Sequence, residues 1–244
     1  YNRGLISKTE DEKGTYLYGE KELKYLNRIV TKTHVAFFDL DERKDARGVQ
    51  GESGGMGSGK MYKISSIRLY ALPEVTNAAG AIVDPGVNGV IKPIKTAYFV
   101  YNYNLCKGMP NNDGTAVAVA NDNAKGKLTL ERVYFTHRGS KMGKYTPYVF
   151  NYGEITNPSD SNYNKDPNNP NYDIKGFDIW GNYKVNPDLS GNSEVPASPL
   201  STAEFPFVEQ NTAQANLYTA AWTLKTVTLP SGGKIAIETE SDDY

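Results

Sequence analysis

The stretch Lys127–Gly153 constrains the fold of this chain most, because it has the pattern of two strands joined by a polar turn. Val133, Phe135 and His137 fall on alternate positions, which in an extended chain point to one face of a sheet. A loop containing two glycines follows, and residues 148–152 then resume an extended pattern. We therefore predict a β-hairpin here.

Further strand patterns lie on both sides of this hairpin. Residues 95–105, KTAYFVYNYNL, alternate over their whole length and carry apolar groups on both faces, which predicts an inner strand. Residues 16–40 and 62–72 also alternate, and a β-branched run in the first of them has low helix propensity. Residues 222–240 predict a second hairpin around a Pro-Ser-Gly-Gly turn. Residues 211–221 alone suggest a helix.

Composition favours the same fold class. Of the 244 residues, 18 are Tyr and 8 are Phe, and aromatic residues favour strands. We predict an all-β fold of hairpin-rich antiparallel sheets with long loops rich in Gly, Asn and Pro. We expect residues 1–244 to form a single β-rich segment, with a candidate sub-boundary near residues 107–126. Because the sequence stops directly after a strand pattern, we expect a fragment of a longer polypeptide, within a larger β shell or sheet.

Charge and hydropathy exclude several classes of partner. The 27 basic and 28 acidic residues give a net charge of −1, so there is no field to attract nucleic acid. No apolar run approaches the roughly 18 residues that a membrane-spanning helix needs. Cys106 is the single cysteine and cannot form a disulfide within the chain.

One glycine-rich loop partly matches a phosphate-binding motif. Gly54, Gly59 and Lys60 have the right spacing, but Met61 stands where the motif needs a hydroxyl to ligate magnesium. The motif also needs a helix after the loop, whereas residues 62–72 have a strand pattern. We predict a glycine loop, residues 39–60 including its charged start, that binds no nucleotide.

The charged start of that loop raises the question of a cation site. Its acidic residues are Asp39, Asp41, Glu42 and Asp45. Calcium loops place oxygen ligands at alternate positions around a glycine and end on a bidentate acid. Here Arg43, Lys44 and Arg47 are interleaved with the acids, so we predict a solvated turn with ion pairs and no metal.

Cys106 could act as a nucleophile only with a base and an orienting partner. The chain has two histidines, His34 and His137, and both occupy strand positions. We therefore predict that Cys106 packs in the interior and that the chain has no catalytic residues and no cofactor.

Trp180 and Tyr183 form the one aromatic pair that could stack on a sugar. Nearby Asn and Asp residues would suit a glycan ligand. The competing interpretation is that Trp180 anchors a core, as large aromatic residues usually do, and we favour it.

Several runs carry a resemblance to a known family: YLNRIVTKTHVAFF with DARGV, SIRLYALPE, PIKTAYFVYNYNLC, GKLTLERVYFT, GKYTPYVFNYG, WGNYK, FPFVEQ and AWTLKTVTLPSGGKIAIETESDDY. Together they resemble a recurring segment of very large secreted proteins of Bacteroidota, which are similar to the Rhs and YD-repeat family. The similarity covers most of the chain, and PYVFNYG with TLPSGGKI is its most specific part. The short periodic Tyr-Asp signature of YD repeats is absent from the sequence.

The resemblance implies a non-catalytic role. Such proteins build shells from repeated β-hairpins, are exported to the cell surface by the type IX route and often end in a variable effector region. The expected partners are flanking segments of the parent chain and secretion or outer-membrane machinery. We therefore predict a structural β-shell or scaffold segment of an extracellular or cell-surface protein, with a surface glycan-binding module as the alternative.

Overall fold

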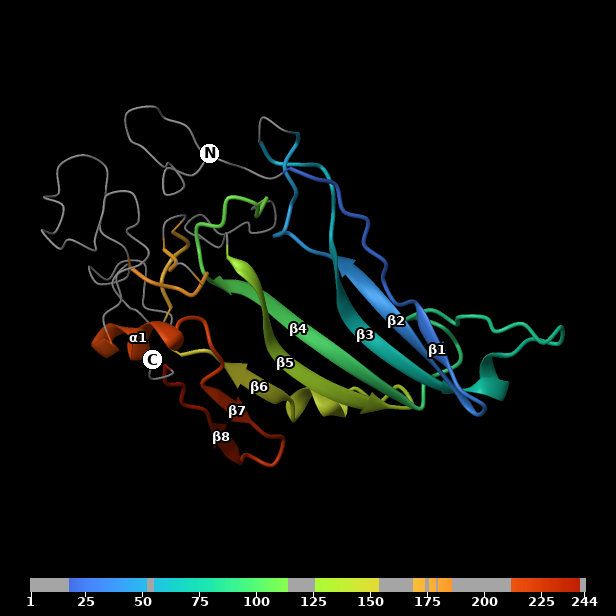
Figure 1. Cartoon of the computed structure of the whole chain (residues 1–244). Helices are drawn as coiled ribbons and strands as arrows, with labels where there is room; N and C mark the ends of the chain where they lie inside the picture. The colour runs from blue at the N-terminus through green and yellow to red at the C-terminus, as the bar shows by residue number, and fades with distance from the viewer. Residues whose placement is uncertain are drawn as a thin grey trace, which may run out of the picture.

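The computed structural model describes residues 18–51, 55–113, 126–153, 169–173, 176–178, 180–185 and 212–241. These residues form one antiparallel sheet of eight strands, which lie side by side in the order of the sequence (Figure 1). The strands are β1 (Arg28–Val30), β2 (His34–Glu42), β3 (Tyr62–Ala71), β4 (Lys95–Leu105), β5 (Lys127–His137), β6 (Tyr148–Asn151), β7 (Thr226–Thr228) and β8 (Lys234–Ala236). The predicted all-β, antiparallel fold class is confirmed.

The long strands β4 and β5 form the middle of the sheet. Their pairing runs from Lys95 opposite His137 to Leu105 opposite Lys127. The register shifts twice, between Val100 and Tyr101, where a bulge adds a residue to β5, and between Asn102 and Leu105. Since β4 pairs with β3 on its other side, the prediction of an inner strand is confirmed.

Both predicted hairpins are present. In the first, Val133 of β5 lies opposite Tyr148 of β6, and the loop between them contains a 3-10 helix, η3 (Met142–Tyr145), that the sequence pattern did not indicate. In the second, Val227 of β7 lies opposite Ile235 of β8, although the paired strands are shorter than predicted. The predicted helix is α1 (Thr212–Thr219).

The predicted start of the glycine loop is wrong. Strand β2 continues through the acidic residues to Glu42, with Asp41 opposite Lys63 and Glu42 opposite Tyr62. Pairing with β3 satisfies the backbone of these residues, and Lys63 places a positive charge opposite Asp41. Tertiary pairing therefore outweighs the loop-like composition of this segment.

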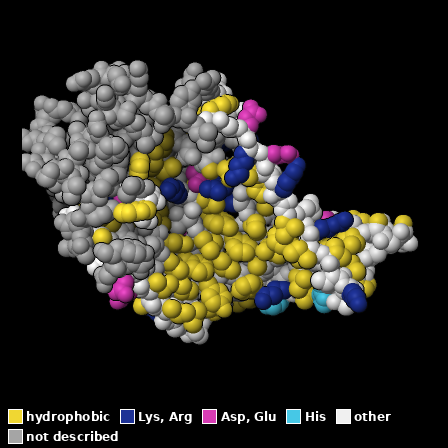
Figure 2. Space-filling view, in the orientation of Figure 1, with side chains coloured by type: hydrophobic (Ala, Val, Ile, Leu, Met, Phe, Trp, Pro, Cys, Tyr) yellow, Lys and Arg dark blue, Asp and Glu magenta, His cyan; other side chains and the backbone are white. Residues whose placement is uncertain are grey.

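One face of the sheet, which we call the apolar face, carries hydrophobic side chains on all eight strands. Cross-strand partners share a face, so the register defines its members. They are Ile29, Ala36, Phe38, Ile67, Leu69, Ala97, Phe99, Tyr101, Leu130, Val133, Phe135, Tyr148, Phe150, Val227 and Ile235. All are half-exposed except Ile29 and Ile235, which are exposed, and none is buried. Figure 2 shows this face, because both histidines of the chain, His34 and His137, lie on it by register and are visible there.

The opposite face, the loop face, is partly covered by residues 72–94, which begin with a second 3-10 helix, η2 (Leu72–Val75). A small core lies under this loop and consists of Val35, Phe37, Tyr70 and Val75, with Leu72 and Ile82 packed against it. Val35, Phe37 and Tyr70 are at most 3% exposed. The described part of the molecule thus buries one face of β2 and β3 and leaves the other half-exposed.

Candidate functional site

Arg68 lies at the centre of the loop face and joins β2, β3 and the loop of residues 72–94. Its guanidinium donates to Asp39 on β2 at 2.7 Å and to Asp84 of the loop at 2.8 and 2.9 Å, and its side chain is 3% exposed. It also lies 5.6 Å from the centroid of the Phe37 ring. Burial acts to lower the pKa of Arg68, but hydrogen bonds to Asp39, Asp84 and Tyr70 outweigh burial and raise it. In the same pair, the hydrogen bond from Arg68 lowers the pKa of Asp84.

A pocket of about 480 Å³ lies beside Arg68 on the loop face. Residues 87–93 form one wall and residues 139–144 the other, and strands β3, β4 and β5 form the floor. Three lysines lie on the walls, Lys92, Lys141 and Lys144, and we call this site the lysine pocket. No Asp or Glu is among the described residues that line it.

The floor of the lysine pocket is made of hydroxyl-bearing side chains, those of Thr96, Tyr98, Tyr134 and Thr136. Tyr98 and Tyr134 stack on each other across β4 and β5, with ring centroids 4.9 Å apart and planes at 18°. Burial raises the pKa of Tyr134. All four side chains present hydroxyl groups that can donate and accept hydrogen bonds.

The apolar face is the second feature that invites a functional interpretation. The ring of Phe135 packs edge to face against Tyr148, with centroids 6.2 Å apart, and the Lys95 ammonium lies 4.1 Å from the Phe135 ring centroid. These contacts fix the position of the Phe135 ring but leave it half-exposed. Contiguous apolar surfaces on this scale mark sites of association.

The loop that partly matches the phosphate-binding motif is not followed by a helix. Lys60 forms an ion pair with Glu42 at 2.7 Å, and the segment after Met61 is the strand β3. Gly54 lies outside the described residues. The strand predicted after the loop is confirmed, and a helix N-terminus at this place is excluded.

Three of the four acidic residues near the end of β2 are already paired. Asp39 binds Arg68, Glu42 binds Lys60, and Asp45 accepts from Arg43 at 2.8 and 2.9 Å. Asp45 also accepts from the backbone N–H of Leu128 and is 3% exposed, and the Arg43 side chain is 24% exposed. This pair is therefore partly buried and is not the solvated surface pair that was predicted. Among the described residues no cluster of His, Cys, Asp and Glu could hold a metal ion.

Cys106 is far from both histidines. It follows the end of β4, whereas His137 lies opposite Lys95 at the start of that strand, and the 11 residues of β4 span roughly 35 Å. His34, opposite Ala71, lies at the same end of the sheet as His137. Cys106 is buried and its thiol lies 3.9 Å from the sulfur of Met109. Its 2% exposure confirms that Cys106 packs in the interior, and this burial raises the pKa of its thiol.

Trp180 and Tyr183 occupy one small loop but do not form a common aromatic surface. Asp178 accepts from the backbone N–H groups of Trp180 and Asn182, and this holds the loop. Trp180 is 71% exposed, so the prediction that it anchors a core is wrong.

The ring of Tyr183 turns inward. It packs against Trp222 at 5.0 Å and Tyr218 at 5.5 Å between ring centroids. Burial raises its pKa to about 12. Tyr183 is thus the anchor of this region, and Trp180 is the aromatic residue that solvent reaches.

Sequence reasoning missed Arg68 and the lysine pocket. Residues 87–93 and 139–144 are far apart in the chain and share no motif, and only the pairing of β4 with β5 places them on opposite walls. One signal was available, since a basic residue inside the alternating run of residues 62–72 implies a buried partner acid.

Within the described ranges, no helix is both long and apolar enough to cross a bilayer. Comparisons with protein families, with curated proteins and with solved structures gave no match.

Proposed function

We propose that this chain is a structural segment of a larger β assembly, and that its apolar face packs against a second β layer supplied by flanking segments of its parent protein. The apolar face is the single observation that carries this proposal. It extends from β1 to β8 without a buried member, whereas the other face of β2 and β3 has a covered core. A covering layer would remove this surface from water, at about 25 cal/mol per Å².

The ends of the sheet support the same role. Strands β1 and β8 each contain three residues, and on their outer sides neither pairs with another strand of the described residues. Further hairpins could add to these edges by the same antiparallel pairing that joins β1 to β8. The role is mechanical and needs no catalytic residue, and the resemblance to large exported shell-forming proteins agrees with a place at the cell surface.

Oxidative footprinting of the native protein tests the covering layer. Phe99 and Phe135 lie half-exposed on the apolar face, whereas Tyr145 in η3 is 68% exposed and lies outside that face. If a second layer covers the apolar face, the two phenylalanines are labelled far less than their exposure in this structure predicts. Tyr145 serves as the internal control and keeps its full labelling. Labelling of all three in proportion to their exposure here contradicts the proposal.

A further inference from the structure

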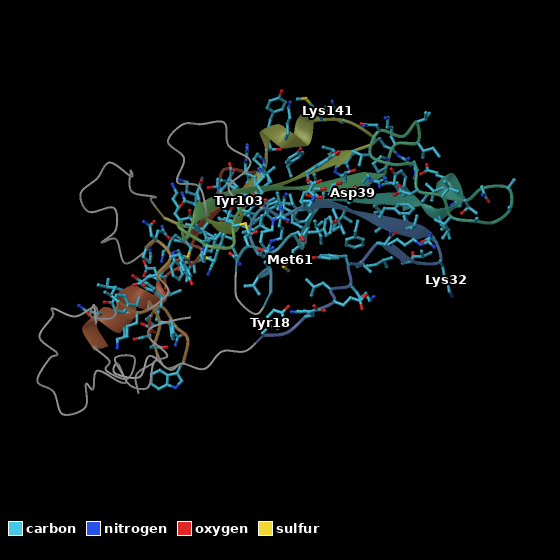
Figure 3. The ribbon with its side chains drawn as sticks, turned by 90° about the horizontal axis from the view of Figure 1, so that it is seen from above. Tyr18, Lys32, Asp39, Met61, Tyr103 and Lys141 are labelled. Carbon is cyan, nitrogen blue, oxygen red and sulfur yellow. The ribbon has the colours of Figure 1, made fainter. Side chains whose placement is uncertain are left out.

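The lysine pocket has an excess of positive charge. Arg68, Asp39 and Asp84 together carry one net negative charge, so the positive charge of the pocket comes from the three lysines on its walls. Lys92 donates to the backbone oxygen of Gly89, and the Lys144 ammonium lies 4.9 Å from the centroid of the Tyr145 ring. The Lys141 ammonium makes no hydrogen bond or ion pair with any described residue. In Figure 3, Lys141 lies beside η3, above the sheet. Three lysines lining one cavity, with no carboxylate among its described lining residues, favour an anionic ligand.

The floor of the pocket supplies hydroxyl groups that could contact a ligand. Thr96 and Thr136 lie there with Tyr98 and Tyr134, and the two threonines are 1% and 7% exposed. A hydroxyl can both donate and accept a hydrogen bond, so this floor suits a ligand that carries its own hydroxyl groups.

Size and shape indicate the class of ligand. The volume of about 480 Å³ lies within the roughly 300–1,000 Å³ of small-molecule sites, so an inorganic ion would fill only part of it. The Tyr98–Tyr134 pair adds an aromatic surface that suits the C–H face of a sugar ring. We infer that the lysine pocket binds an anionic saccharide, a sugar that carries a carboxylate or sulfate group. This inference is independent of the apolar face and of Trp180.

Calorimetric titration of the native protein with a sulfated uronic-acid disaccharide tests the inference. We expect saturable binding that weakens by at least about tenfold in the double variant Lys141→Glu/Lys144→Glu, because each lost ammonium contact is replaced by repulsion. Thr96→Val, which keeps the shape and removes the hydroxyl, should weaken binding by several-fold. Lys32→Glu is the matched control, since Lys32 lies at the β1–β2 turn, well away from Lys141 (Figure 3).

Comparison with other ligands tests whether the pocket selects a sugar that is also anionic. Cellobiose, a neutral disaccharide, should bind much more weakly, and sodium sulfate at the same concentration should not displace the bound sugar. The inference is overturned if cellobiose binds equally well, if sodium sulfate competes mole for mole, or if adenosine monophosphate binds more tightly than the sugar. It is also overturned if Lys32→Glu weakens binding as much as the pocket variant, or if no binding is detected at millimolar sugar. Circular dichroism of each variant verifies that the fold is retained.

Discussion

At the scale of single residues, Arg68 is the group whose loss should destabilise the fold most. Its side chain is 3% exposed and pairs with Asp39 and Asp84, whose carboxylates belong to two different segments. In Arg68→Met the stem still packs, but both acids lose their partner. We expect the free energy of unfolding, measured in urea, to fall by about 3–5 kcal/mol.

Arg132→Met is the matched control for this experiment. Arg132 pairs with Glu131 at the surface, where the side chains are 44% and 38% exposed, and such pairs contribute about 0–1 kcal/mol. Adding Asp39→Asn and Asp84→Asn to Arg68→Met should recover part of the loss, because the unpaired charges are gone. Equal losses in Arg68→Met and Arg132→Met would show that the Arg68 network does not hold the loop.

Asp84 should make the free energy of unfolding depend on pH in the acidic range. Its pKa is lowered by the hydrogen bond from Arg68, so the unfolded chain takes up the proton before the folded protein does. The stabilisation is complete above the unfolded pKa of about 3.9 and is lost as the pH falls through the folded value below it. We expect the free energy of unfolding to decrease on acidification below about pH 5, and to decrease less steeply in Asp84→Asn.

The measurement is a series of urea unfolding curves between about pH 7 and pH 3. Glu22→Gln provides the comparison, since Glu22 forms an exposed pair with Lys24 that should leave the slope unchanged. A wild-type slope that Asp84→Asn does not alter would contradict the linkage.

At the scale of elements, local patterns were enough to predict the strands and the two hairpins, but not the pairing of strands that are distant in the sequence. The predicted strand of residues 95–105 has the same bounds as β4. This prediction needs only the alternation of side chains within the segment itself. The pairing of Asp39 with Arg68 and Asp84 depends on which strand lies next to β2 and on how residues 72–94 cross it. Long-range arrangement of this kind leaves no periodic signal in one sequence.

The contrast between local pattern and long-range arrangement also explains why the exposure of Trp180 and the position of the lysine pocket were not predicted. The prediction for Trp180 used the average behaviour of a large aromatic residue, whereas hydrogen bonds from the turn to Asp178 decide its exposure. The pocket needs η3, and η3 needs Gly143 close to the backbone of β5. Neither requirement is visible in composition or spacing.

Gly143→Ala tests how tightly η3 is packed onto β5. A Cβ at Gly143 would overlap the carbonyl oxygen of Phe135, so the loop of residues 138–147 must move away from the strand. We expect a loss of about 1–3 kcal/mol in the free energy of unfolding, as for other overpacked sites. Thermal and urea unfolding both measure it.

Gly59→Ala is the control, because a Cβ there meets nothing within 4 Å. Its effect should stay within about 0.5 kcal/mol. If Gly143→Ala were equally mild, η3 would be free to shift, and the wall of the lysine pocket formed by residues 139–144 would not be fixed.

At the scale of the whole molecule, the sheet is asymmetric. One face holds the core under residues 72–94 and the lysine pocket, while the apolar face is half-exposed along its length (Figure 2). A sheet needs a second layer to bury its hydrophobic face. The loop face meets this need over part of its area, and under the proposed function the second β layer meets it on the apolar face.

A charge placed on the apolar face measures whether that layer is present in the native protein. In Phe99→Asp or Phe135→Asp the carboxylate would reach water if the face were uncovered, and the cost would be limited to the loss of a half-exposed ring, about 1–2 kcal/mol. Beneath a second layer the carboxylate would be buried without a partner, and we expect a loss of about 3–5 kcal/mol in the free energy of unfolding. Val90→Asp is the control, since Val90 is 95% exposed in the loop of residues 72–94 and should tolerate the charge. Losses in the two phenylalanine variants that stay near the lower value would mean that the apolar face is open in the native protein, and the proposed layer would then be absent.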